Sequence, residues 1–131
     1  MGPLRILVAD DNESIRTVLR EILQSESGWQ VCGEAKNGED AIRQARELSP
    51  DIILMDIMMP KCGGIDATRE IVRSAPDTRV LIMTLYEFPE LCSEARNVGA
   101  LGFVQKADSV RCLIPAVRCL AEDKTYFPNA N

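Results

Sequence analysis

Residues 52–56 read Ile-Ile-Leu-Met-Asp, a short apolar run that ends in a carboxylate. Three further runs, at 5–9, 80–84 and 101–104, are also almost wholly apolar, whereas a fifth at 29–35 alternates apolar and polar residues. Apolar runs of this length are typical of strands buried on both faces of a sheet, and interleaved polar residues are typical of an edge strand. The sequence therefore predicts five strands, of which the second lies at an edge.

Helical periodicity separates these runs. Apolar residues recur at spacings of three and four, most clearly at Ile15, Val18, Leu19, Ile22 and Leu23. Asn12 is placed to cap that first helix, Pro50 and Pro76 follow the second and third, and Gly99 follows the fourth. Pro115 falls about two turns into the fifth helix, where the loss of a backbone hydrogen bond predicts a bend or a late start.

Five strand-then-helix units predict a doubly wound α/β fold with a parallel sheet, because right-handed crossovers place helices over both faces. The 131 residues, 46% of them hydrophobic and 27% charged, suffice for one domain with one core. No apolar run approaches the roughly 18 residues that span a bilayer, and no secretion signal is present. We therefore expect a cytoplasmic protein with no membrane partner.

Charge and composition exclude several functions. The 15 basic and 20 acidic residues give a net charge of −5, which argues against direct nucleic-acid binding. Histidine is absent, which excludes imidazole metal ligands, Ser-His and Cys-His nucleophile pairs and a phosphohistidine carrier. Five scattered cysteines without a C-x-x-C pair support neither a disulfide framework nor a zinc site.

Polar residues follow four of the expected strands. Asp10 and Asp11 follow the first, Asp56 ends the third, Thr84 ends the fourth, and Lys106 comes two residues after the fifth. Carboxyl ends of parallel strands share one edge, so these side chains are expected to converge there. Three neighbouring carboxylates repel one another unless a divalent cation neutralises them, and oxygen ligands without histidine favour Mg²⁺. Asp56 is then the candidate nucleophile toward a phosphoryl group gripped by Lys106 and Thr84.

Four motifs stand in order at these strand ends: Val8-Ala-Asp-Asp-Asn12, Met55-Asp-Ile-Met-Met-Pro60, Met83-Thr84 and Gly102-Phe-Val-Gln-Lys106. Over residues 4–122 the chain resembles the receiver domain of two-component response regulators, most closely those of the LuxR type, and leaves 123–131 as a tail or truncated linker. The resemblance implies a flavodoxin-like (βα)5 fold with strand order 2-1-3-4-5.

The resemblance also implies a role for each residue of the metal and phosphoryl site. Asp56 would take a phosphoryl group from a sensor histidine kinase. Asp11 would bind Mg²⁺ directly and Asp10 largely through water, with Asp56 and the backbone carbonyl of Met58 as further ligands. On this view the domain is no enzyme toward external substrates, because it catalyses only its own phosphorylation and dephosphorylation.

Other residues are candidates for the conformational switch on phosphorylation and for control of the lifetime of the phosphoryl group. Thr84 and Phe103 match the family positions that move together on phosphorylation. Met58 and Tyr86 lie two residues after Asp56 and Thr84, at positions that resemble the family's tuners of dephosphorylation. Apolar or aromatic cover there predicts a long-lived phosphoryl group.

Expected partners are the kinase, a second copy after phosphorylation, and a helix-turn-helix output domain if the full-length chain continues. Two residues depart from the family pattern, namely Ala107, where many receivers have proline, and Pro115. Two other functions stay open: a degenerate receiver that acts as a constitutive interaction module, and a Mg²⁺-dependent phosphohydrolase. The hydrolase is disfavoured because Met58 stands where a second aspartate could act as general acid.

Overall fold

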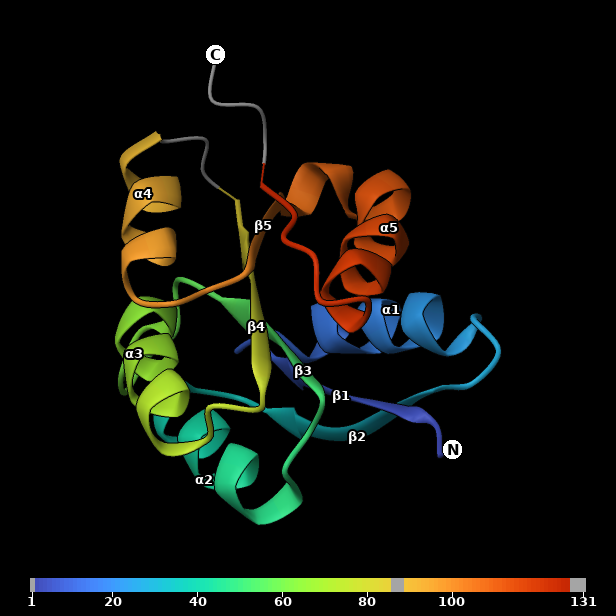
Figure 1. The fold of residues 1–131 in the computed structure, drawn as a ribbon, viewed down its shortest axis with the longest axis horizontal. Coiled ribbons are helices and arrows are strands. Elements are labelled where there is room, and N and C mark those ends of the chain that lie inside the picture. Colours follow the sequence, from blue (N-terminus) through green and yellow to red (C-terminus); the bar gives the residue numbers. More distant parts are fainter. Residues whose placement is uncertain (1, 86–88, 128–131) are drawn as a thin grey trace.

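The computed structural model describes residues 2–85 and 89–127. Its sheet is parallel, with strand order β2-β1-β3-β4-β5, as expected (Figure 1). The strands are β1 (Leu4–Ala9), β2 (Trp29–Ala35), β3 (Ile52–Asp56), β4 (Arg79–Thr84) and β5 (Gly102–Gln105). Each bound lies within one residue of the predicted run, and β2 lies at an edge.

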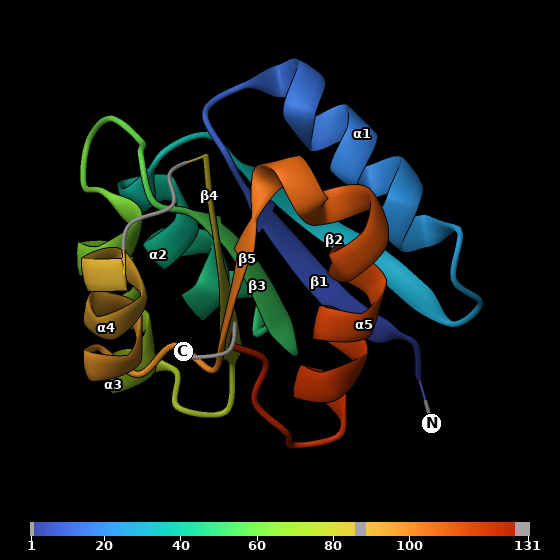
Figure 2. The same cartoon turned by 90° about the horizontal axis from the view of Figure 1, so that it is seen from above.

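Five α-helices connect and cover the strands. They are α1 (Glu13–Gln24), α2 (Gly38–Leu48), α3 (Gly64–Ser74), α4 (Pro89–Asn97) and α5 (Ser109–Ala121), with a 3-10 turn at Lys106–Asp108 before α5. Helices α1 and α5 cover one face of the sheet, and α2, α3 and α4 cover the other (Figures 1 and 2). The doubly wound architecture predicted from the sequence is thereby confirmed. Within the described residues, no helix combines the length and apolarity needed to cross a bilayer.

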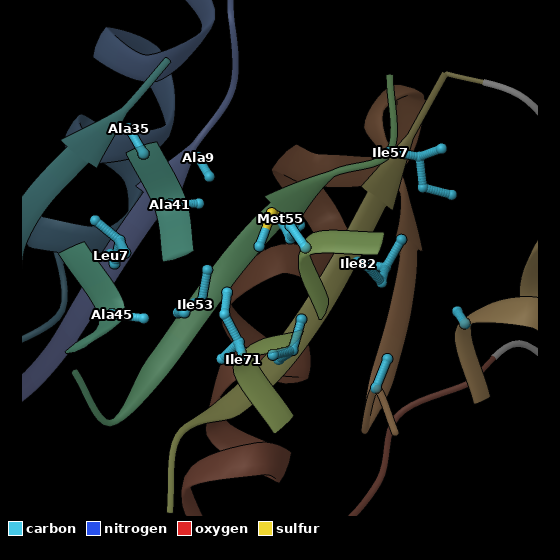
Figure 3. Close-up of a cluster of buried hydrophobic side chains, with 14 of the residues drawn as sticks. Leu7, Ala9, Ala35, Ala41, Ala45, Ile53, Met55, Ile57, Ile71 and Ile82 are labelled. Carbon is cyan, nitrogen blue, oxygen red and sulfur yellow. The ribbon is translucent and has the colours of Figure 1, made fainter. Parts of the chain in front are cut away.

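The strands separate two hydrophobic cores because their successive side chains point to opposite faces. Figure 3 shows the core beneath α2, α3 and α4, where β1, β3 and β4 contribute Leu7, Ala9, Ile53, Met55 and Ile82. The intervening residues of the same strands enter the second core beneath α1 and α5, together with Leu19, Leu23, Leu113, Val117 and Leu120. All three inner strands are therefore buried on both faces, which explains their apolar composition.

A local signal sets the start of α1 but does not decide the course of α5. Asn12 caps α1 by accepting a hydrogen bond from the Ile15 N–H at 3.1 Å, as predicted. Helix α5, however, begins at Ser109 and continues through Pro115, so the alternative of a late start is wrong. The Pro115 ring removes the bond to the Arg111 carbonyl, but the flanking turns bury Leu113 and Val117 in the second core.

The chain reverses after α5 and returns along β5. Asp123 adopts a left-handed φ of 62°, and the Lys124 N–H bonds the Cys119 carbonyl at 2.8 Å. Tyr126 then donates to the Leu101 carbonyl and accepts from the Phe103 N–H, at 2.9 and 2.8 Å. The boundary placed after residue 122 stays a prediction, but the expected tail is packed against the sheet as far as Phe127.

Candidate functional site

Three carboxylates meet at the carboxyl edge of the sheet. Asp10 and Asp11 lie in the turn from β1 to α1, and Asp56 ends β3. One oxygen from each lies within 4.8 Å of the others. Asp10 and Asp56 are 1% and 4% exposed, whereas Asp11 is exposed. The predicted convergence is confirmed for these three carboxylates, and we call them with Lys106 the acidic site.

Lys106 brings one positive charge to the acidic site. Its Nζ lies 2.7 Å from Asp10 Oδ2 and 3.2 Å from Asp56 Oδ2. The lysine side chain is nearly buried, and it begins the 3-10 turn that follows β5. A single ammonium leaves the negative charge of the three carboxylates in excess, which is costly in a desolvated place.

Burial and charge shift the titration of these groups. Burial, followed by the charge of Asp10, raises the pKa of Asp56 to about 6, although Lys106 opposes the shift. For Lys106, burial works against the charged ammonium, but Asp10 and Asp56 outweigh it and raise its pKa. Asp56 is therefore ionised and Lys106 protonated near neutral pH.

A cavity of about 150 Å³ opens above the acidic site. Its wall consists of Asp10, Asp11, Asn12, Ile15, Asp56, Met58, Leu85 and Lys106. Met58 and Leu85 are 60% and 67% exposed, so apolar side chains flank the entrance. Oxygen donors of the carboxylate and carbonyl kind suit a hard cation such as Mg²⁺, and the excess of buried negative charge fits a divalent ion.

The two switch candidates lie beneath the surface. Thr84 is fully buried at the end of β4, and Phe103 is 4% exposed within the core beneath α2, α3 and α4. Neither residue belongs to the cavity wall. Tyr86, the second tuning candidate, lies outside the described residues.

Two glycines that the sequence reasoning missed leave room for close backbone approaches to Asp56 and to the loop that follows it. A Cβ on Gly64 would lie 2.1 Å from the Asp56 carbonyl oxygen, and one on Gly38 would lie 1.9 Å from the Cys62 carbonyl oxygen. The Gly64 N–H also donates to the Ile57 carbonyl at 2.8 Å. The adjacent pair Gly63-Gly64 was the one sequence feature that could have drawn attention to Gly64. Its closeness to Asp56, however, depends on how the start of α3 packs against the end of β3.

A family model for the response regulator receiver domain matches residues 6–118. The chain belongs to this receiver family. Response regulator GacA of Pseudomonas viridiflava is 37% identical over 124 residues, which cover 95% of this chain and 58% of that relative. The receiver chain thus spans somewhat more than half the length of this curated relative.

Solved structures agree with this assignment. A LuxR-family two-component response regulator from Aurantimonas sp. SI85-9A1 superposes with a TM-score of 0.91 at 31% identity, over 95% of this chain and 89% of that one. The response regulator domain of Thermotoga maritima CheB gives a TM-score of 0.77 at 34% identity, over 92% of each chain. The resemblance to LuxR-type receivers, expected from four short motifs, is confirmed.

Proposed function

We propose that this receiver is a phosphoacceptor switch in which Asp56 takes the phosphoryl group of a sensor kinase's phosphohistidine. The observation that carries the proposal is the acidic site itself. It places a buried, ionised carboxylate beside two others and one lysine, at the floor of a cavity open to solvent.

Asp10, Asp11, Asp56 and the Met58 carbonyl would hold Mg²⁺. Bound there, the ion supplies positive charge that offsets both the carboxylates and the phosphoryl oxygens. The excess of buried carboxylate charge over the single Lys106 ammonium supports this assignment.

Asp56 acts as the nucleophile. One carboxylate oxygen attacks phosphorus in line, the P–N bond to the donor imidazole breaks, and its electron pair stays on that nitrogen. A pKa of about 6 leaves Asp56 mostly ionised at pH 7 and therefore able to attack. Lys106 Nζ, 3.2 Å from Asp56 Oδ2, is placed to bind a phosphoryl oxygen of the product.

Phosphorylation then shifts a two-state surface. Thr84 moves toward the new phosphoryl oxygens, and Phe103 follows it inward. The surface of α4, β5 and α5 changes with them and controls dimerisation, or a LuxR-type DNA-binding output domain if the full-length chain continues into one. Reversing a 99:1 population needs about 5.5 kcal/mol of differential stabilisation, so a second copy or output partner is expected to complete the shift.

The phosphoryl group is expected to be long-lived. Met58 and Leu85 place apolar side chains at the cavity entrance, where they hinder an attacking water. We expect the domain to turn over no external substrate and to catalyse only its own phosphorylation and slow dephosphorylation.

Incubation with Mg²⁺ and acetyl phosphate, followed by intact mass measurement, tests the function. We expect one added phosphoryl group in the wild type and none in Asp56→Asn or in EDTA. Absence of any gain in the wild type would favour a constitutive interaction module. Steady release of phosphate from a phosphomonoester would favour the hydrolase.

A further inference from the structure

Arg16 connects the acidic site to the neighbouring edge strand. Its side chain, on α1, is 13% exposed. Nη1 donates to the Asp10 carbonyl at 2.7 Å, and Nε donates to Glu34 Oε1 at 3.0 Å. Glu34 lies on β2, in register with Val8 of β1.

Hydrogen bonds hold both the backbone N–H and the backbone carbonyl of Asp10. Its N–H donates to the Ala35 carbonyl at 3.0 Å, while its carbonyl accepts from Arg16. Its Oδ1 accepts from the Asn12 N–H at 2.9 Å, which leaves Oδ2 directed toward Lys106. Strand β2 thus holds Asp10 twice, directly through Ala35 and indirectly through Glu34 and Arg16.

The carbonyl that Arg16 binds belongs to the peptide joining Asp10 to Asp11. The plane of that peptide sets the direction in which the Asp11 side chain leaves the backbone. Asp11 is exposed and is repelled by two buried carboxylates, so an unanchored turn would relax by rotating it outward.

We infer that Arg16 is a positioning residue for the cation site, holding the Asp10–Asp11 peptide so that three carboxylates face one point. This inference rests on the proposed function, because it concerns the affinity of the acidic site for Mg²⁺. Partners behind metal ligands commonly change metal affinity by about 10-fold to 100-fold.

The sign of the effect separates positioning from simple electrostatics. Arg16 carries a positive charge close to the acidic site, so its loss strengthens Mg²⁺ binding if charge alone matters. Loss of the anchor weakens binding. A purely structural role lowers the free energy of unfolding and leaves the Mg²⁺ affinity of the folded protein unchanged.

Calorimetric Mg²⁺ titration of Arg16→Gln, Arg20→Gln and wild type distinguishes these outcomes, with folding checked by circular dichroism. Arg20 also pairs with Glu34 and is therefore a matched control for loss of a neighbouring charge. We expect about tenfold weaker binding in Arg16→Gln and binding within twofold of wild type, or tighter, in Arg20→Gln. Arg16→Lys, which keeps the charge but not the forked geometry, is expected to weaken binding as well and serves if Arg16→Gln fails to fold.

Unchanged or tighter binding in the folded Arg16 variants would overturn the inference and leave the proposed function intact. Equal weakening in Arg16→Gln and Arg20→Gln would also overturn it. Absence of Mg²⁺ binding by the wild type would overturn both proposals.

Discussion

At the scale of single residues, the surroundings of Asp56 destabilise its ionised carboxylate. Burial and the nearby charge of Asp10 raise its pKa to about 6 from an ordinary value of 3.8. A raised carboxyl pKa means that the folded state holds its proton more tightly than the unfolded state does. The associated stability is fully present below about pH 4 and is lost as the pH rises through about 6.

The first prediction concerns the metal-free protein in EDTA. Between pH 4 and pH 7, the free energy of unfolding of the wild type should fall relative to that of Asp56→Asn by about 2–3 kcal/mol. Urea unfolding of both proteins at a series of pH values measures this difference. Saturating Mg²⁺ should remove most of it, and parallel pH profiles in EDTA would contradict the assigned environment of Asp56.

The second prediction concerns the glycine behind Asp56. Gly64→Ala places a Cβ against the Asp56 carbonyl oxygen, so either Asp56 or the start of α3 must move. We expect at least tenfold slower phosphorylation by acetyl phosphate and a loss of about 1–3 kcal/mol in the free energy of unfolding. Gly63→Ala is the control, because its Cβ would approach no closer than 3.3 Å to the Ile57 carbonyl oxygen. Equal phosphorylation rates in the two variants would show that the close approach does not position Asp56.

At the scale of secondary-structure elements, the segment after α5 behaves as an addition to β5. Tyr126 forms two backbone hydrogen bonds, with Phe103 of that strand and with Leu101 just before it, and Phe127 packs against the core beneath α2, α3 and α4. The guanidinium of Arg96 on α4 lies 4.1 Å from the centre of the Phe127 ring. The segment therefore joins α4 to the edge of β5, beside the buried Phe103.

The third prediction follows from that packing. Phe127→Ala should lower the free energy of unfolding by about 1–2 kcal/mol, because it removes partly buried aromatic area and the contact with Arg96. Lys124→Ala, which affects only an exposed pair with Glu122, should change it by less than about 0.5 kcal/mol. Urea unfolding of the two variants measures the difference, and equal stabilities would mean that the segment is only loosely held.

Strands and helices were predictable because each depends on residues close together in sequence. The strand at 52–56 is apolar up to its final Asp56 because both of its faces are covered, and Asn12 caps its own helix. The packing of Tyr126 and Phe127 against the sheet was not predictable. Their partners lie on or next to β5 and on α4, far away in sequence, and the residues around them show no hydrophobic periodicity. Continuation of α5 through Pro115 likewise depends on burial of its neighbours, which outweighs the lost bond.

Some residues of the acidic site were predictable from the sequence, whereas the contacts that hold them in place were not. Asp10, Asp11, Asp56 and Lys106 were predictable because parallel strands bring their carboxyl ends to one edge. The contacts of Arg16 and Gly64 with the backbone of these residues were not predictable. They depend on the register of β2 and on the placement of α3, and no local sequence pattern indicates either.

At the scale of the whole molecule, the three carboxylates lie at the ends of β1 and β3, and the segment after α5 lies along β5, at the edge of the same sheet. Thr84 on β4 and Phe103 on β5 lie between them, both buried. We expect a rearrangement that follows Asp56 phosphorylation to reach the α4, β5 and α5 surface through these buried side chains and through Lys106, which follows β5. A packed core changes between discrete arrangements, which favours a two-state response.

The fourth prediction is a change of assembly. Beryllofluoride with Mg²⁺, which mimics a phosphoryl group on Asp56, should increase the dimer fraction of the wild type and leave Asp56→Asn unchanged. Size-exclusion chromatography with light scattering measures the molar mass in each state. The same monomeric mass in both proteins, with and without the mimic, would contradict dimerisation by this domain.

Asp56, and neither of the other two carboxylates, is the residue that we expect to receive the phosphoryl group. Borohydride reduces an aspartyl phosphate to homoserine, so reduction after treatment with acetyl phosphate and Mg²⁺, followed by peptide mass mapping, identifies the modified position. We predict homoserine at position 56 and unmodified aspartate at positions 10 and 11. Homoserine at position 10 or 11, or none at any of the three, would contradict the account.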